Sequence, residues 1–190
     1  MQFEQRQGLI LESLASQGSV RVADLQKLCD VSDMTIRRDL ETLEQQGLLK
    51  RTHGGAVAAV SGSYEPPFAS RALLAQSAKE RIANLAASRI HDGDTVIIDV
   101  GSTTLAVAHL LRNRSQLTVL TPSLRIATEL ADSPGIRLML TGGSIRPGEL
   151  SLVGPLAEVA FENFIFDHFV MGVGGIHPTA GVTEYNLDDA

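Results

Sequence analysis

Residues 3–50 carry apolar side chains at helical spacing. Leu9, Leu11 and Leu14 begin the pattern, and the segments VADLQKLC and MTIRRDLETLEQQ continue it with a tight connection between them. Apolar residues that recur every three or four positions form one face of a helix. A short helix, a tight turn and a second helix together predict a helix-turn-helix at about residues 20–39.

The second helix of this pair has the clearer pattern. Ile36, Leu40 and Leu43 recur at i, i+4 and i+7, which predicts a single buried stripe. Ser32 is a suitable N-cap residue before the helix, and Gly47 is a suitable C′ residue after it. The charged side chains near the start of the helix therefore lie off the buried stripe.

The rest of the chain alternates helical and extended patterns. The segments DTVIIDV, LTVLT, IRLMLTGG and DHFVMGV are short apolar runs, and helical patterns lie between them. Near-continuous apolar strands that alternate with helices predict a mostly parallel sheet in an α/β fold, with both faces covered. A helix is expected over SAKERIANLAASRI, with an apolar face formed by Ile82, Leu85, Ala86 and Ile90.

A change of composition divides the chain into two parts. Residues 57–70 lose the helical periodicity and gather glycine, serine and two prolines, which is typical of a linker. We therefore expect an N-terminal domain over residues 1–57, a linker over 58–71 and an α/β domain over 72–190.

Composition narrows the kinds of protein that the chain can be. A hydrophobic content of 44% and a charged content of 20% are ordinary for a globular protein. The single cysteine, Cys29, excludes an intramolecular disulfide and a multi-cysteine zinc site, and its helical context predicts a small core residue. The histidines are isolated and lack metal-ligand spacing, so we expect neither a metal nor a cofactor.

Signals for secretion, membrane insertion or a strongly basic domain are missing from the sequence. The start MQFEQRQGLI has no basic region followed by an apolar run, and no apolar run approaches the thickness of a bilayer. We therefore expect a cytoplasmic protein with no membrane partner. The net charge is −6, and residues 1–55 hold seven basic and eight acidic side chains. Binding to nucleic acid would thus depend on the local placement of charge.

Two adjacent arginines, Arg37 and Arg38, stand near the start of the second helix. Recognition helices place such residues in the major groove, where arginine pairs with guanine or clamps phosphate. Downstream, LLKRTHGGAV predicts two strands and a glycine turn, a wing whose basic tip would contact the sugar-phosphate backbone. The alternative for Arg37 is a solvated pair with Glu41. The candidate residues for binding double-stranded DNA are Ser32, Met34, Thr35, Arg37, Arg38, Lys50, Arg51 and His53.

Loops rich in glycine and hydroxyl groups follow the expected strands of the α/β domain. In IIDVGSTTLAVAHLL, the loop opens a helix whose backbone N–H groups and positive dipole end suit a phosphate. Asp99, Thr121 and Gly142 stand at strand ends, where open α/β sheets bind ligands. The alternative is that the loops are structural caps and that Lys79, a candidate cation, is an ordinary exposed lysine.

The segment VADLQKLCDVSDMTIRRDLETLEQQGLLKRTHGGA strongly resembles the winged helix-turn-helix of DeoR-type bacterial transcriptional regulators. The motifs TIRRDL, LE..G and R.HGGA carry the resemblance, and IIDVGSTT, LMLTGG and MGVGGI extend it over nearly the whole chain. It implies a sugar-phosphate sensor domain related to the ribose-5-phosphate isomerase and CoA transferase fold. The effector-binding residues that it implies are Lys79, Asp99, Gly101, Ser102, Thr103, Thr104, Thr121, Gly142 and Gly143.

Two features depart from the family pattern. Pro122 stands where the family usually has asparagine after the strand-end threonine. Family members usually run several tens of residues beyond GVTEYNLDDA, with further strands and a phosphate-binding lysine. We therefore expect the sensor to be incomplete at its C-terminus, with an uncovered sheet edge.

Three functions follow from these observations. The first is a DNA-binding regulator, a repressor of a carbohydrate operon that a phosphorylated sugar releases from operator DNA. A homo-oligomer is expected with it, because helix-turn-helix proteins bind paired half-sites. The second is a sugar-phosphate isomerase, for which the sequence offers no catalytic base beyond Asp99. The third is a dimerisation module with an inactive sensor.

Overall fold

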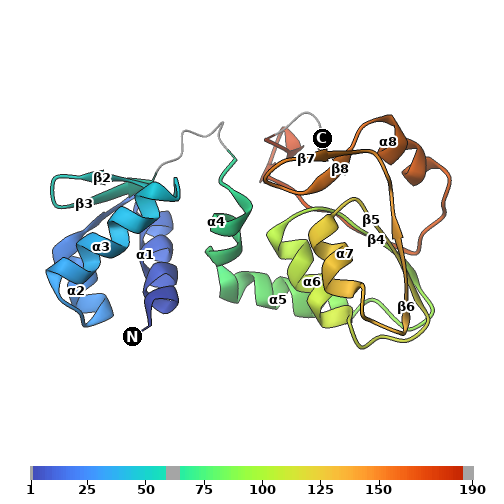
Figure 1. The fold of residues 1–190 in the computed structure, drawn as a ribbon, viewed down its shortest axis with the longest axis horizontal. Coiled ribbons are helices and arrows are strands. Elements are labelled where there is room, and N and C mark those ends of the chain that lie inside the picture. The colour runs from blue at the N-terminus through green and yellow to red at the C-terminus, as the bar shows by residue number, and fades with distance from the viewer. Residues whose placement is uncertain (1, 59–64, 186–190) are drawn as a thin grey trace. The chain divides into compact units, whose positions relative to one another are not determined.

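The structure is a computed structural model that describes residues 2–58 and 65–185. The chain divides into two compact units, Met1–Gln76 and Ser77–Ala190 (Figure 1). The elements of the first unit are α1 (Phe3–Gln17), β1 (Ser19–Arg21), α2 (Val22–Cys29), α3 (Asp33–Gln45), β2 (Leu49–Thr52), β3 (Gly55–Ala58) and α4 (Phe68–Leu73).

Helices α1, α2 and α3 enclose the core of the first unit. The expected stripe of α3 is confirmed, because Ile36, Leu40 and Leu43 are each at most 1% exposed. Cys29, at the end of α2, is buried among the same side chains, as its context predicted. Gly47 adopts a left-handed conformation just after α3, with φ +73°, as expected of a C′ residue.

A three-stranded antiparallel sheet, in the order β1-β3-β2, completes the first unit. Strands β2 and β3 form the expected hairpin, with His53 and Gly54 as its two-residue turn. Strand β1 was not predicted. Its approach to β3 requires Gly55, because a Cβ there would lie 1.9 Å from the carbonyl oxygen of Val20.

Helix α4 overlaps the end of the range that the sequence favoured as linker, 58–71, and continues to Leu73. Leu73 and Leu74, at its end, pack against the core of the first unit. At its start, Arg71 Nη2 lies 3.0 Å from Glu65 Oε1, and the arginine also stands over the ring of Phe68. The division between the units consequently falls after Gln76.

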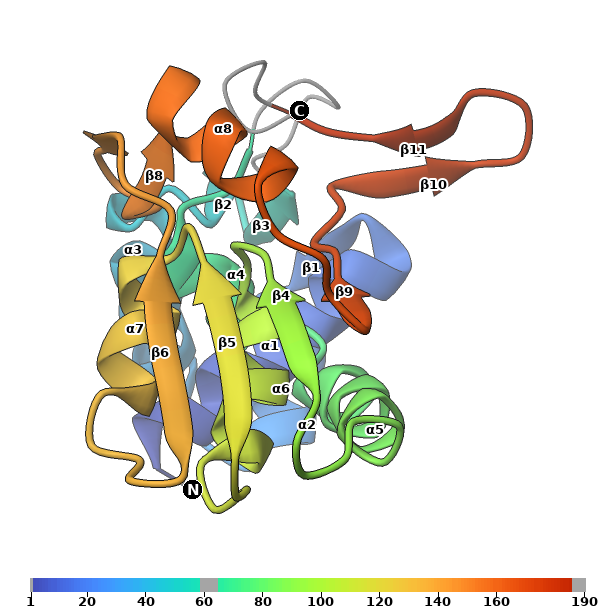
Figure 2. The ribbon, with the colours of Figure 1, turned by 90° about the vertical axis from the view of Figure 1, so that its right-hand side faces the viewer.

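The second unit is built on a parallel sheet in the order β6-β5-β4-β9. Figure 2 shows α5, α6 and α7 together on one face of this sheet. The prediction that helices cover both faces of the sheet is therefore wrong for the described residues. The elements are α5 (Gln76–Ala87), β4 (Thr95–Ile98), α6 (Ser102–Leu111), β5 (Leu117–Thr121), α7 (Leu124–Leu130), β6 (Ile136–Leu140), β7 (Ser144–Arg146), β8 (Ser151–Val153), α8 (Pro155–Glu162), β9 (His168–Val170), β10 (Gly175–His177) and β11 (Gly181–Thr183).

Helix α5 corrects one expectation. Ile82 and Leu85 were assigned to its buried face, but they are 53% and 60% exposed. The helix instead packs through Ala83 and Ala87, four residues apart, which belong to the core of the second unit. The buried side chains of α5 are therefore small, whereas the hydrophobic pattern favoured its largest apolar residues.

Candidate nucleic-acid interface and effector site

The outer surface of α3 carries the main candidate residues. Met34 and Arg38 are four residues apart, and helical geometry places both opposite the stripe of Ile36 and Leu40. Met34 is 76% exposed, and Arg38 is exposed as well. Among the described residues, the guanidinium of Arg38 has no hydrogen-bond or ion-pair partner. These two side chains form an outward ridge on α3.

The hydroxyl groups at the start of α3 fix the helix. Ser32 Oγ accepts a hydrogen bond from the backbone N–H of Thr35 at 3.3 Å, as an N-cap does. The same Oγ lies 2.8 Å from Thr35 Oγ1, so the two hydroxyls bond each other. Ser32 and Thr35 thus hold the first turn in place, beside the ridge that Met34 and Arg38 form.

Arg37 lies on the side of α3 that faces the wing. Its guanidinium pairs with Asp33, one turn earlier in the helix, and not with Glu41 as the alternative supposed. The hydrogen bond to Asp33 and its negative charge raise the pKa of Arg37. Both side chains are about half exposed, so the pair stabilises the fold little and mainly orients the guanidinium.

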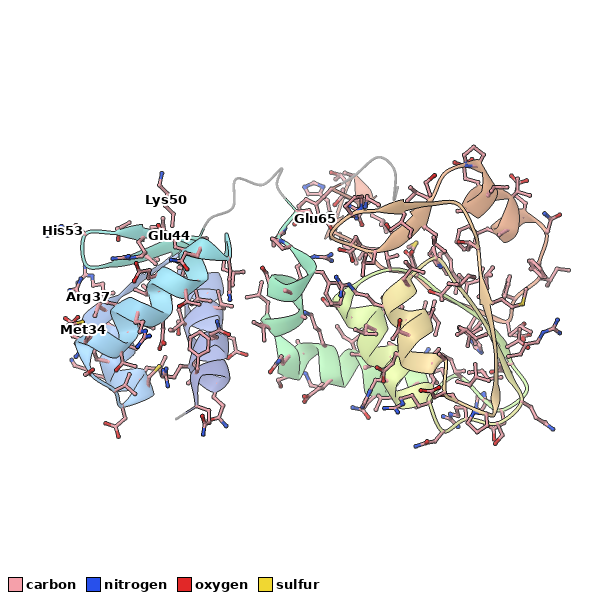
Figure 3. The ribbon with its side chains drawn as sticks, viewed as in Figure 1. Met34, Arg37, Glu44, Lys50, His53 and Glu65 are labelled. Carbon is pink, nitrogen blue, oxygen red and sulfur yellow. The ribbon has the colours of Figure 1, made fainter. Side chains whose placement is uncertain are left out.

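The wing is joined to α3 through Glu44. Glu44 Oε1 accepts a hydrogen bond from the backbone N–H of Arg51 on β2 at 2.8 Å. Successive side chains of a strand alternate in direction, so Lys50 and Arg51 leave opposite faces of the wing. In Figure 3, Met34, Arg37 and His53 project from the same edge of the unit, and Lys50 points away from that edge.

A buried ion pair supports α3 from α1. Arg6 Nε lies 2.6 Å from Asp39 Oδ2, and Arg6 Nη2 lies 3.0 Å from Oδ1, which is a bidentate arrangement. The side chains are 11% and 5% exposed. The hydrogen bond to Asp39 raises the pKa of Arg6, although burial opposes it. Above the pair lies an open hollow of about 500 Å³ that Met34 and Arg38 help to line.

This arrangement offers what a major-groove reader needs. A cation and an apolar side chain project together from the first turns of a helix, and that helix is fixed on both flanks by Arg6 and Glu44. Cations that contact phosphate position a protein on DNA, whereas contacts to base edges determine sequence.

The second unit brings the candidate effector residues to one edge of the sheet. Asp99 follows β4, Thr121 ends β5 and Gly142 follows β6, and these three strands are neighbours that run in parallel. Figure 2 shows their carboxyl ends side by side. Gly101 to Thr104 belong to the same edge, because they connect β4 to α6. Lys79 comes from the first turn of α5.

Asp99 also has a structural role. Its Oδ1 accepts a hydrogen bond from the backbone N–H of Val100 at 2.7 Å, and its Oδ2 accepts one from Gly172 at 3.1 Å. The carboxylate therefore ties the end of β4 to the end of β9. Gly172 permits this approach, since a Cβ there would lie 2.2 Å from the carbonyl oxygen of Val100.

The hydroxyl residues of these loops fall into two groups. Thr104 donates to the carbonyl of Gly101 at 2.9 Å, and Thr121 Oγ1 accepts from the backbone N–H of Ser123 at 3.1 Å, so both support the loops. The side chains of Ser102 and Thr103 are half-buried and make no hydrogen bond within the described residues. They begin α6, whose N-cap Gly101 offers no side-chain acceptor. The first backbone N–H groups of α6 thus lack a side-chain cap.

The loop that contains Pro122 is closed by a neighbouring hairpin. The carbonyl of Pro122 accepts from the backbone N–H of Leu152 on β8 at 2.7 Å. Gly143 leads into the same hairpin, and a Cβ there would lie 2.5 Å from the carbonyl oxygen of Val153. The β7–β8 hairpin, which was not predicted, therefore packs against the loop that follows β5.

Three residues that position the interface were not predicted from the sequence. Arg6, Asp39 and Glu44 were not singled out, because their partners lie on other elements. Arg6 and Asp39 are 33 positions apart, and no periodicity connects them. A charged residue within the otherwise apolar stripe of α3 was a usable signal for Asp39, since a buried charge requires a partner.

The described residues offer neither a metal site nor a membrane-spanning helix. Within the residues that the structure describes, no group of three histidine, cysteine or acidic side chains could hold a metal ion. No helix in the described ranges has the length and apolar character that crossing a membrane requires.

Comparison with known proteins covers both units. The family model described as a DeoR-like helix-turn-helix domain matches residues 6–61, and the one described as a DeoR C terminal sensor domain matches residues 74–190. The chain is 37% identical over 183 residues to the HTH-type transcriptional regulator GolR of Listeria innocua, covering 96% of this chain and 72% of GolR. It is 36% identical over 189 residues to the glycerol-3-phosphate regulon repressor of Escherichia coli K12, covering 100% and 75%. It is 35% identical over 185 residues to the HTH-type transcriptional repressor CsqR of the same strain, covering 97% and 70%.

Proposed function

This chain belongs to the DeoR family of transcriptional regulators, and on that premise we propose that it represses a carbohydrate operon and leaves operator DNA when a phosphorylated sugar binds. Membership makes it a DNA-binding regulator and not an enzyme, so the isomerase alternative is set aside. Its place of action is then the cytoplasm, where operator DNA lies.

The outward ridge of α3 carries the DNA-binding half of the proposal. Arg38 is exposed and has no partner among the described residues, and it stands six residues after the N-cap Ser32. The other proposed contacts come from Ser32, Met34, Thr35 and Arg37 on α3 and from Lys50, Arg51 and His53 on the wing. Lys50 and Arg51 leave opposite faces of the wing. A wing that approaches the DNA backbone by one face would therefore contact it through one of these two side chains, together with His53 at the tip.

The edge formed by the strand ends supports the effector half of the proposal. Uncapped backbone N–H groups at the start of α6, next to the hydroxyls of Ser102 and Thr103, would receive the phosphate group. Asp99 and Thr121 would face the sugar, with Lys79 as the cation. The glycines at 101, 142 and 143 would let the ligand approach the backbone closely.

The two halves are connected by linkage. The effector must bind the DNA-free arrangement more tightly than the DNA-bound one, and the ratio of these affinities sets the loss of operator affinity. A homo-oligomer is part of the proposal, because paired half-sites require two recognition helices.

Binding to DNA and to the effector can be tested on one protein. The full chain is used to select double-stranded sites from a random library, and the chosen site is titrated with and without a panel of sugar phosphates and the free sugars. We expect nanomolar to micromolar binding that one phosphorylated sugar weakens and its free sugar does not. Selection of no sequence would overturn the regulator proposal. Binding to DNA that every sugar phosphate leaves unchanged would favour a dimerisation module with an inactive sensor.

A matched pair of variants locates the effector. Ser102→Asp places a carboxylate in the first turn of α6, where it repels a phosphate and is itself stabilised by the helix dipole. We expect it to abolish the response to the sugar phosphate and to keep the affinity for DNA. Gln116→Asp adds the same charge at the opposite end of β5, at an exposed left-handed position, and should respond as the native chain does. Equal responses from both variants would place the effector elsewhere.

A further inference from the structure

Met34 is an unusual residue for the surface of a DNA-binding helix. It is 76% exposed, the only large apolar side chain of α3 to be so exposed, and it lies in the first turn of that helix. The other apolar side chains of α3, Ile36, Leu40 and Leu43, are fully buried. Met34 therefore contributes nothing to the core, and its exposure leaves apolar surface in contact with water.

The neighbours of Met34 limit which group it can read. The hydroxyls of Ser32 and Thr35 hydrogen-bond each other, and Ser32 also caps the helix by accepting from the backbone N–H of Thr35. Arg37 is paired with Asp33. Only Arg38 shares the outward ridge of α3 at this end of the helix, one turn further along. Both side chains also line the same hollow of the surface.

The major groove offers one apolar group to a side chain of this kind. Each base pair presents hydrogen-bond donors and acceptors there, and thymine adds its C5-methyl group. A methionine thioether is flexible and polarisable, so it can pack on a methyl group without strict geometry.

We propose that Met34 is a specificity-determining residue that contacts the methyl group of a thymine beside the guanine read by Arg38. The inference rests on the proposed binding of operator DNA. Side chains at i and i+4 of a helix are about 5–6 Å apart at Cβ. The rise of DNA is about 3.4 Å for each base, so the thymine and the guanine lie within about two base-pair steps.

The test exchanges thymine for deoxyuridine, which pairs identically but lacks the methyl group. The selected site is synthesised with one deoxyuridine at each thymine in turn, and the dissociation constant is measured for the full chain. One or two positions in each half-site should weaken binding about four-fold per contacted methyl, the effect of exposing one methyl-sized group. Met34→Ala should bind the thymine and deoxyuridine sites equally at those positions, whereas Met34→Leu should retain the discrimination.

Each result has a distinct meaning. Since Met34 is exposed, circular dichroism and thermal unfolding of both variants should match those of the native chain. If the native chain binds its selected site but no deoxyuridine weakens it, the role of Met34 is overturned and the DNA-binding function stands. If Met34→Ala discriminates as strongly as the native chain, another residue contacts the methyl group. If no site is selected, the function and the inference fail together.

Discussion

Glu44 on α3 accepts a hydrogen bond from the backbone N–H of Arg51 on β2, with 2.8 Å between the two atoms. The helix that carries the proposed base contacts is thereby joined to the wing that carries the proposed backbone contacts. The joint uses the main chain of Arg51 and leaves its side chain available for DNA.

Removal of the Glu44 side chain should loosen the wing. We expect Glu44→Ala to raise the dissociation constant for the selected site several-fold, corresponding to about 1 kcal/mol for a hydrogen bond of this type. Fluorescence anisotropy with labelled DNA measures it. Glu44→Gln keeps an acceptor oxygen and removes a negative charge, so it should bind at least as tightly as the native chain. Tighter binding by both variants would mean that Glu44 acts only through its charge.

Arg38 and Arg37 should differ in what they determine. Arg38→Ala should cost about 1–3 kcal/mol on the selected site and relax the preference at one base pair, as expected of a base contact. Arg37→Ala should weaken selected and unrelated sites by the same factor, as expected of a phosphate contact. A competition assay with site variants gives both numbers. Identical specificity profiles for the two variants would contradict the assignment.

The buried pair of Arg6 and Asp39 should be costly to break on one side only. Asp39→Ala removes the carboxylate from a largely buried bidentate pair, and we expect a loss of about 3–5 kcal/mol in the stability of the first unit. The double variant Arg6→Met, Asp39→Leu removes both charges and should lose much less. Hydrogen exchange of the α3 amides in urea, measured on the full chain, reports the stability of this unit. Equal losses in the single and double variants would show that the charge left behind is not the cause.

Acid should weaken the tie between β9 and β4. Asp167 Oδ2 accepts hydrogen bonds from the backbone N–H and the hydroxyl of Thr95, at 2.8 and 2.7 Å, and these lower the pKa of Asp167. Because the folded-state pKa lies below the unfolded one, the contribution to stability is complete above the unfolded pKa, about 4, and is lost as pH falls through the folded value.

Urea midpoints followed by circular dichroism from about pH 6 to about pH 2 test this prediction. The native chain should lose stability below about pH 4 more steeply than Asp167→Asn does. Asp132→Asn, in the exposed loop before β6, is the control and should follow the native curve. Parallel curves for the native chain and Asp167→Asn would contradict the prediction.

The sequence was most informative where structure is local. The stripe of Ile36, Leu40 and Leu43, the cap at Ser32 and the left-handed Gly47 all depend on residues within a turn or two of one another. Alternating patterns predicted that the sheet is parallel, although not the order of its strands, and the motifs identified the family.

The sequence was least informative where distant segments meet. Strand β1 has three residues, too few for a period, and it forms because Gly55 lets it approach β3. The tie between Asp99 and Gly172 spans 73 positions. On α5 the pattern favoured Ile82 and Leu85, because hydrophobicity alone does not reveal which face of the helix meets the core.

The pairing of Arg37 with Asp33 has a consequence for how such a regulator can change over generations. Asp33 binds the guanidinium of Arg37 much as a phosphate would, so the proposed contact of Arg37 with the DNA backbone would exchange one anion for another. A neutral residue at position 33 would raise the affinity for DNA of every sequence by the same factor, because the side chains proposed to contact bases would be unchanged. On this proposal, residue 33 sets the overall affinity for DNA, and Met34 and Arg38 set the sequence preference. A substitution could therefore change one of these properties without changing the other.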